Sequence, residues 1–446
     1  MKKLNFIIKC GLALLLLSFY SCESWLNVTP SDRLSEEMLF NDREGFVKAL
    51  NGVYIELNTN ELYGRNLTAG ALDVMGQYYS VASSSHAFYN YGGLVYTGND
   101  EKALFDNMWQ KCYAVIACCN TIIEKCDENK AGLSPVWRGS IKGEALALRA
   151  MLHFDMLRLF GPLTSELDKE SIPYQTNSDQ TVTPLLSGSE VVGLILDDLK
   201  NAVGLLKDTD PYFVEEEFSD TDLNYRRFRM NYFAAKGLMA RVQLWGGDKE
   251  KAAATAKEVI AEGQAEGAEF FPFVTNSEAT SSNPDRVFYS EVLFGTYHSS
   301  REKLHEDLFA PTLESTSILT LAGTARRDDL YDNENDYRYS VWSTYNKNGT
   351  SVLYHRKFEK QDNVTASRQY MIPLIRMSEM YLIAVECCKL DEASVYLNTF
   401  RNARNCNSLA LTEDNRINIL ANEYKKEMLG EGQLFFFYKR QEMVNI

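Results

Sequence analysis

A chain of 446 residues is long enough to bury a large core, as one large domain or as about two to three ordinary ones. It carries 46 Lys and Arg against 61 Asp and Glu, a formal net charge of −15, and this acidic balance argues against nucleic acid as a partner. Aromatic residues make up 12% of the sequence and include 25 Tyr, a residue that suits both wet binding surfaces and protein cores, so the enrichment alone assigns no site.

Residues 1–21 have the pattern of a targeting segment. Three lysines precede or begin an apolar run at residues 10–19, which is too short to span a bilayer comfortably and is typical of a signal peptide. Ser21-Cys22 at its end resembles a lipoprotein cleavage site, which predicts that Cys22 becomes a lipidated N-terminus. Cleavage there would remove three lysines and no acidic residue, changing the formal net charge from −15 to −18. Ordinary signal cleavage, with release of a secreted protein, is the alternative.

Residues 71–97 combine aromatic rings with loop-forming residues. Six of them are Tyr or Phe, separated by Ser, Gly, Ala and Asn without a sustained period, and this composition predicts a loop. Two interpretations stand side by side. The loop packs its own rings onto the helices beneath it, or it forms a platform that stacks on a ligand.

Helical periodicity runs through the middle of the chain, where small residues lie on the expected contact faces. Paired helices of this kind are typical of tetratricopeptide-like repeats. Glu144 and Arg149 are expected to form ion pairs between helices, because a lone Glu and Arg make no acid–base pair. The expected helices cover residues 101–126, 136–160, 189–206, 231–245 and 249–262.

Seven cysteines follow Cys22, and their spacing is not that of a metal site. Three of them recur every seven residues, which places them on one stripe of a helix and favours buried thiols. Disulfide pairing in an exported protein is the alternative. The seven are Cys112, Cys118, Cys119, Cys126, Cys387, Cys388 and Cys406, and the stripe consists of Cys112, Cys119 and Cys126.

Helical periods weaken between residues 270 and 372. Residues 286–297 and 351–358 are expected to form short strands. Residues 328–345 are acidic and aromatic, but no glycine or terminal Glu falls at EF-hand spacing. A solvated acidic loop is therefore favoured over a calcium site.

Residues 376–405 predict two helices joined by a tight turn, which forces them antiparallel into a hairpin. Pro373 marks where the first helix can begin, because proline is tolerated at a helix start and not inside it. Asp391 can cap the second helix. Charged residues along the first helix are expected to be structural; these are Arg376, Glu379 and Glu386.

The hairpin resembles the C-terminal motif of the SusD/RagB family. That motif reads Arg-x-x-Glu-x-Tyr-Leu-Ile-Ala-x-Glu from Arg376, then Tyr-Leu-Asn-x-x-Arg-x-Ala-Arg from Tyr396. Other stretches resemble the family in the same order along nearly the whole chain after the signal segment. They are Leu-Asn-Gly-Val-Tyr ending at Tyr54, Gly-Glu-Ala-Leu-Ala-Leu-Arg-Ala from Gly143, and Gly-Glu-Gly from Gly430.

Members of this family are nutrient-binding outer-membrane lipoproteins of Bacteroidetes-type bacteria. The resemblance implies that residues 22–446 form a single, mainly α domain of tetratricopeptide-like helix pairs with long irregular loops and a few short strands. Residues 61–100 and 267–372 would supply its variable, ligand-facing surface. The protein would be lipid-anchored at the cell surface and would deliver oligosaccharide to a SusC-like TonB-dependent transporter.

Peptide or glycopeptide cargo is the alternative within the family, and a pure scaffold protein is a further one. No nucleophile elbow, zinc-protease motif or phosphate-binding loop is present, so we expect no catalytic residue, metal or cofactor. A surface glycoside hydrolase stays open, because its carboxylate pair has no local motif.

Six rings from the two variable segments are expected to meet the ligand. A pyranose has apolar C–H faces, which an aromatic ring covers, and a rim of hydroxyls, which polar side chains bind. The alternative is that half of these rings pack against the helices. The expected contacts are Tyr78, Tyr79, Tyr89, Tyr91, Trp342 and Tyr345, with Asp73 and Asn90 as hydrogen-bonding partners.

Overall fold

The computed structural model describes residues 36–179, 181–267 and 270–444. Within these residues the chain forms 18 α-helices and six short strands, which pair in three two-stranded antiparallel sheets. The predicted mainly α fold is confirmed. The predicted signal segment and Cys22 lie outside the described residues.

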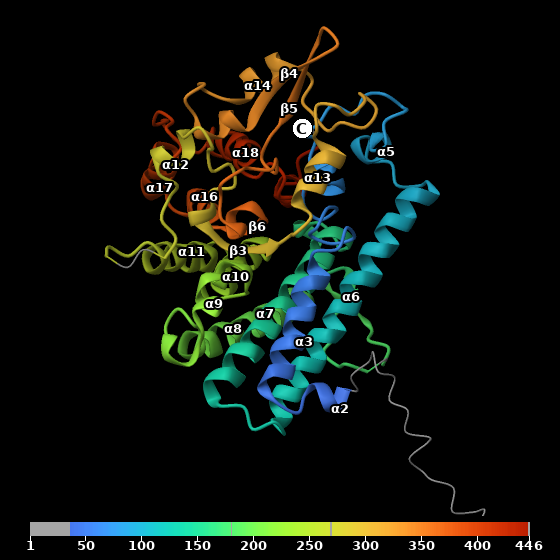
Figure 1. The fold of residues 1–446 in the computed structure, drawn as a ribbon, viewed down its shortest axis with the longest axis vertical. Coiled ribbons are helices and arrows are strands. Elements are labelled where there is room, and N and C mark those ends of the chain that lie inside the picture. The colour runs from blue at the N-terminus through green and yellow to red at the C-terminus, as the bar shows by residue number, and fades with distance from the viewer. Residues whose placement is uncertain (1–35, 180, 268–269, 445–446) are drawn as a thin grey trace, which may run out of the picture.

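Long helices form a continuous stack in which each packs against the next, in the order α3, α6, α7, α8, α10, α11, α16 and α17. In Figure 1 the stack runs from the lower part, where α3 lies, to α16 and α17 in the upper half. The short helix α2 precedes the stack, and the paired strands β1 and β2 lie between α7 and α8 in the sequence. The bounds are α2 Glu36–Leu39, α3 Arg43–Leu57, α6 Asn99–Glu128, α7 Pro135–Phe160, β1 Glu170–Pro173, β2 Leu185–Ser187, α8 Gly188–Thr209, α9 Asp220–Asn224, α10 Tyr232–Trp245, α11 Lys249–Gly263, α16 Met377–Cys387 and α17 Leu390–Asn402.

The five helices predicted in the middle of the chain are found within three residues of their expected ends. Side-chain caps explain where they start. Ser134 accepts a hydrogen bond from a backbone N–H of the first turn of α7, and Asn231 does the same for α10. Ser187 and Glu190 form a reciprocal capping box at the start of α8. Such caps satisfy backbone donors that the helix itself cannot.

Small residues set the spacing between α7 and α8. A Cβ atom at Gly139 would come within 2.6 Å of Thr209, and one at Gly143 within 2.8 Å of Leu206. Any larger side chain would have to push the helices apart, since atoms in a packed core tolerate no such approach. The two glycines, one turn apart, therefore allow the close contact that the predicted repeats need.

Residues 270–444 fold over one end of the helical stack, in the upper part of Figure 1. Strand β3 pairs with β6, which leads directly into α16 and so joins the two halves. Residues 58–98 cross to this upper half, where α4 packs against α19. The bounds are α4 Ala71–Met75, α5 Tyr89–Gly92, α12 Asn276–Thr280, β3 Val292–Tyr297, α13 Arg301–Leu308, α14 Thr324–Leu330, β4 Trp342–Lys347, β5 Thr350–His355, α15 Ala366–Gln369, β6 Met371–Arg376, α18 Arg416–Glu427 and α19 Gln433–Arg440.

Two predictions about the hairpin need correction. Pro373 does not begin a helix; it lies inside β6 opposite Gly295, in a two-stranded sheet where a missing N–H is tolerated at an edge. Asp391 lies in the first turn of α17 rather than at its cap, which is Lys389. The predicted strand at residues 286–297 is also shorter, because a 3₁₀ turn precedes β3.

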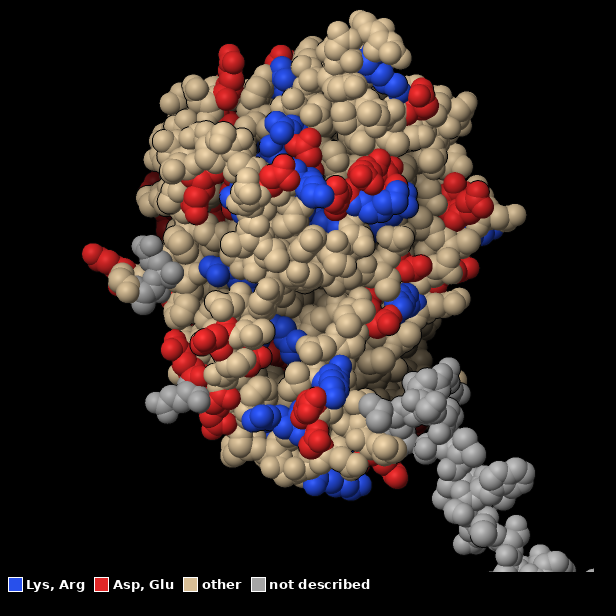
Figure 2. All heavy atoms as spheres, in the orientation of Figure 1, with Lys and Arg blue, Asp and Glu red and all other residues tan. Residues whose placement is uncertain are grey.

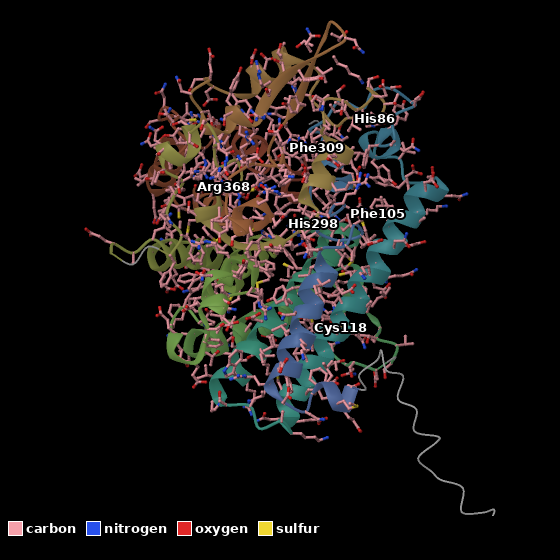
Figure 3. All side chains as sticks on the ribbon, in the orientation of Figure 1. His86, Phe105, Cys118, His298, Phe309 and Arg368 are labelled. Atoms are coloured by element: carbon pink, nitrogen blue, oxygen red, sulfur yellow. The ribbon has the colours of Figure 1, made fainter. Side chains whose placement is uncertain are left out.

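The cysteines are free thiols throughout the described part of the chain. The predicted stripe on α6 is fully buried, and burial raises the pKa of all three thiols, that of Cys126 to about 12. Buried thiols are therefore confirmed for this stripe. Cys118, on the same helix, is exposed (Figure 3).

Acidic and basic side chains are interspersed over both halves on the face drawn in Figure 2. The negative net charge is therefore not gathered into one patch on that face. Many other charged side chains lie inside the protein.

A network of buried ion pairs holds the upper half together. Its centre is the carboxylate of Glu427, which accepts hydrogen bonds from Arg338, Arg376 and Arg404. Burial disfavours the charged carboxylate, but Arg404 and Arg376 outweigh that effect and hold the pKa of Glu427 well below its ordinary value. The three arginines come from the 3₁₀ turn before β4, the end of β6 and the turn after α17.

The network extends from these arginines to further buried groups. Glu423, one turn before Glu427, binds Lys426 at 3.0 Å and also pairs with Arg338 and Arg401. Each central arginine also holds a second carboxylate: Glu291 for Arg404, Glu431 for Arg376 and Asp336 for Arg338. The prediction of a solvated acidic loop at residues 328–345 is therefore wrong for Asp336, which is buried because Arg338 neutralises it.

The charged residues predicted to be structural are buried and paired. Arg149 binds both oxygens of its partner on α8 at 2.7 Å, which is an ion pair between neighbouring helices as expected. The partners are Asp198 for Arg149, Arg241 for Glu379, Arg440 for Glu386, and Arg226 with Arg229 for Glu144.

Replacing Glu427 by Gln should destabilise the protein by about 3–5 kcal/mol, because three buried arginines lose a shared charge. Urea unfolding at neutral pH measures the change. Glu392→Gln is the matched control, since Glu392 is exposed and pairs with Lys257 at 2.9 Å on the surface. It should cost less than about 1 kcal/mol. Equal stabilities for the two variants would contradict the central role of Glu427.

Candidate functional site

The structure buries most of the rings that the sequence assigned to the ligand. Tyr89 and Tyr345 are 42% and 44% exposed, whereas Tyr78, Tyr79, Tyr91 and Trp342 are each 5–6% exposed. Tyr79, Tyr91 and Trp342 pack against other residues and offer no free face for stacking. Tyr78 is also largely buried, but it alone of these four borders a pocket.

Asp73 is a buried anchor rather than a ligand contact. Its carboxylate accepts hydrogen bonds from the backbone N–H groups of Gly430 (2.6 Å) and Gly432 (2.9 Å) and from the hydroxyl of Tyr79. Burial raises the pKa of Asp73 to about 7, although these hydrogen bonds favour its charged form. Both glycines have positive φ, and a Cβ at Gly432 would lie 2.3 Å from the carbonyl oxygen of Leu67. The Gly-Glu-Gly turn therefore presents two backbone N–H groups to the carboxylate of Asp73 on α4.

The two predicted variable segments meet through buried aromatic contacts. Tyr79 stacks on His355, with ring centroids 6.1 Å apart, and Phe309 packs on the same imidazole at 3.7 Å. Figure 3 places Phe309 in the upper half, at the end of α13. Trp342 packs edge-on against His355 and donates its indole N–H to Tyr331. The segments are therefore neighbours as expected, but most of their rings join them instead of facing outward.

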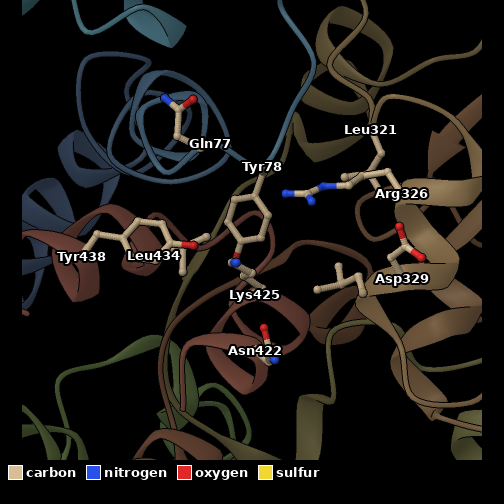
Figure 4. A pocket seen from close by; sticks show the side chains of 10 residues that line it. Gln77, Tyr78, Leu321, Arg326, Asp329, Asn422, Lys425, Leu434 and Tyr438 are labelled. Carbon is tan, nitrogen blue, oxygen red and sulfur yellow. The ribbon is translucent and has the colours of Figure 1, made fainter. Parts of the chain in front are cut away.

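A pocket of about 230 Å³ opens where these segments meet the C-terminal helices. Tyr78 stands in its middle (Figure 4). Two other hollows, of about 190 Å³ and 460 Å³, contain no residue of either segment. The residues lining the pocket are Gln77 and Tyr78 after α4; Leu321, Arg326, Asp329 and Leu330 in and before α14; Asn422 and Lys425 on α18; and Leu434 and Tyr438 on α19.

Helical spacing aims these side chains into the pocket. Asn422 and Lys425 are three residues apart on α18, and Leu434 and Tyr438 are four apart on α19, so each pair shares one helix face. Tyr78 donates its hydroxyl to the backbone carbonyl of Tyr424 at 3.1 Å, which fixes its ring against α18.

The pocket combines two tyrosine rings with amide and charged groups. Burial raises the pKa of Tyr78 and Tyr438, so both are neutral hydroxyls at physiological pH. Burial, and then the charge of Arg326, lower the pKa of Lys425. Rings beside a few convergent polar groups are typical of small-molecule sites, whose usual volume is about 300–1,000 Å³. This pocket is smaller, so it suits one part of a longer ligand.

The pocket has few side chains of the kinds that act as nucleophiles or as general acids and bases. Its lining includes one carboxylate, Asp329, and no His, Cys or Ser. Elsewhere in the described residues no group of three or more His, Cys, Asp or Glu side chains is placed to hold a metal ion. The arrangement can bind and orient a polar ligand with aromatic faces and hydrogen-bonding edges.

Comparison with known families gives this pocket a context. A family profile described as "Starch-binding associating with outer membrane" matches residues 24–244, and one described as "SusD family" matches residues 282–444. The chain belongs to the SusD/RagB family. None of the helices in the described residues has the length and apolar character needed to cross a membrane.

Relatives within the SusD/RagB family agree with this assignment. "SusD-like protein P2" of Formosa agariphila is 25% identical over 265 residues, which cover 58% of this chain and 46% of the relative. The match thus spans less than half the length of that relative. A SusD-like carbohydrate-binding protein of Bacteroides vulgatus has the same fold, with a TM-score of 0.70 at 22% identity over 90% of this chain and 84% of that one. A laminarin-binding SusD-like protein superposes with a TM-score of 0.64 at 17% identity, over 90% and 91% of the two chains.

Of the eight predicted contacts, Tyr78 alone lines the pocket. Tyr89, Asn90 and Tyr345 are exposed outside it, and Asn90 donates a hydrogen bond to Glu101. Sequence reasoning missed the residues of α14, α18 and α19. Their helical spacing was visible, but no local signal showed that three helices would present these faces to one another.

Alanine variants should separate core rings from surface rings. Tyr79→Ala and Trp342→Ala should each destabilise the protein by about 3–5 kcal/mol, because each leaves a cavity in packed aromatic surroundings. Tyr345→Ala is the control and should change the free energy of unfolding by less than about 0.5 kcal/mol. Denaturant unfolding measures all three, and an unchanged stability of Trp342→Ala would overturn its assignment to the core.

Proposed function

We propose that the protein is a cell-surface nutrient-binding lipoprotein that captures an oligosaccharide and delivers it to a SusC-like TonB-dependent transporter. The observation that carries the proposal is the pocket around Tyr78, formed where the two segments expected to vary within the family meet α18 and α19. Membership in the SusD/RagB family supports it, as does the carbohydrate-binding or laminarin-binding character of its structural neighbours.

The residues of the pocket fit a sugar. The ring of Tyr78 would cover an apolar C–H face, while the amides of Gln77 and Asn422 would bind hydroxyls at its edge. Because the pocket holds part of a chain, further sugar units would run onto the surface. The exposed rings of Tyr89 and Tyr345, with Asn90, stay proposed contacts for those units.

A binding protein fits the pocket better than a glycoside hydrolase does. Most glycoside hydrolases place two carboxylates on either side of the scissile bond. Asp329 is the one carboxylate among the lining residues, and it has no acidic partner there. Peptide or glycopeptide cargo stays the alternative within the family, since tyrosine rings and amides also suit peptides.

Tyr78→Ala should lower the affinity for the cognate oligosaccharide by roughly thirtyfold, about 2 kcal/mol, because a ring anchor is lost. Titration calorimetry on the folded protein measures this. Tyr79→Ala is the matched control: it removes the neighbouring ring, which faces His355, and should cost stability while affinity stays within about twofold. Binding that survives Tyr78→Ala, or sugars released during the titration, would contradict the proposal.

Cys22→Ala should move the protein from the membrane pellet to the soluble fraction, because acyl chains supply its anchor and one protein surface rarely replaces them. Fractionation is done in cells that lack the partner transporter, with the wild-type protein as the matched control. A variant that stays in the membrane would refute lipidation at Cys22.

The transporter is tested separately on the wild-type protein. Affinity capture from membranes in mild detergent should recover a TonB-dependent outer-membrane transporter. Capture of no outer-membrane protein would favour a binder that works alone.

A further inference from the structure

Two cations in the pocket have no acidic partner among the described residues. Arg326 on α14 and Lys425 on α18 both line it, and neither forms an ion pair or a hydrogen bond to a side chain. Their immediate neighbours differ. Arg327 pairs with Asp328 at 2.7 Å, and Lys426 pairs with Glu423 at 3.0 Å.

The two charges act on each other. Figure 4 shows the guanidinium of Arg326 directed toward the ring of Tyr78, and Lys425 borders the same pocket. After burial, the charge of Arg326 is the influence that lowers the pKa of Lys425, and no carboxylate opposes it. Lys425 also lies 6.0 Å from the ring centre of Tyr438, a contact that holds it at the pocket wall.

A neutral ligand would leave this repulsion in place and would remove water from both cations. An anion bound between them would neutralise the like charges and form charge-assisted hydrogen bonds, which are about twice as strong as neutral ones. The forked donors of an arginine match the paired oxygens of a carboxylate or sulfate, and a lysine adds a point charge.

We propose that the pocket recognises an anionic substituent of the captured oligosaccharide, either the carboxylate of a uronic acid or a sulfate ester on a sugar ring. This inference rests on the proposed function of glycan capture. Arg326 and Lys425 bind the anionic group, Asn422 and Gln77 bind neighbouring hydroxyls, and the ring of Tyr78 lies against the sugar. Asp329, three residues after Arg326 on α14, also lines the pocket and takes a hydroxyl of the sugar.

The test uses the full chain and a panel of neutral, uronate-bearing and sulfate-bearing oligosaccharides. Each acidic chain is also present in an uncharged form, after carboxyl reduction or desulfation, so that the two anionic groups are told apart. Chains that bind are then titrated by calorimetry against wild type, Arg326→Gln, Lys425→Gln and Lys425→Arg. Arg327→Gln is the matched control, because it removes the same charge from the same helix outside the pocket.

We expect binding to acidic chains that is lost when their charge is removed and that weakens as salt rises. Arg326→Gln and Lys425→Gln should lower the affinity about tenfold or more, Lys425→Arg should restore most of it, and Arg327→Gln should leave it within about twofold. Binding of neutral chains with affinities that Arg326→Gln and Lys425→Gln leave unchanged would overturn this inference while glycan capture stands. Binding of no glycan of either kind would overturn both.

Discussion

The carboxylate of Glu427 is shared by three buried arginines that reach it from three separate parts of the chain. A charge removed from water is tolerated only when partners and hydrogen bonds replace the water. Removing one partner leaves the remaining charges buried without compensation, which destabilises the fold. The 3₁₀ turn before β4, the end of β6 and the turn after α17 therefore converge on α18, and the shared charge ties their positions to one another.

The same helix connects this network to the pocket. Glu423, Lys426 and Glu427 point inward from α18 to the buried ion pairs, whereas Asn422 and Lys425 line the pocket. Adjacent residues thus serve opposite faces, and anchoring one face orients the other. Asp73 completes the arrangement, because its hydrogen bonds to Gly430 and Gly432 bring α4, and with it Tyr78, against the start of α19. The pocket residues on α18 and after α4 are therefore positioned by the buried carboxylates of Glu427 and Asp73.

Several features follow from sequence pattern alone. The periodicity of apolar and small residues located five long helices of the stack to within three residues of their ends. The seven-residue spacing of three cysteines predicted their burial on α6, and an arginine and a glutamate without acid–base partners predicted structural ion pairs. These signals are readable because each depends on residues a few positions apart, which a helix places on one face.

Tertiary structure decided the site. An aromatic residue in an irregular segment carries the same sequence signal whether its ring faces solvent or core. Tyr79 and Trp342 were therefore assigned to the ligand, although both rings pack against His355. The cations of the pocket sit on α14 and α18, about a hundred residues apart in sequence, and nothing near either one reveals the other. Sequence determined which helices form and that charges on them such as Glu144, Arg149 and Glu379 are structural, because those are local facts. Which faces meet, and so where a ligand can bind, depends on long-range packing that only the folded chain defines.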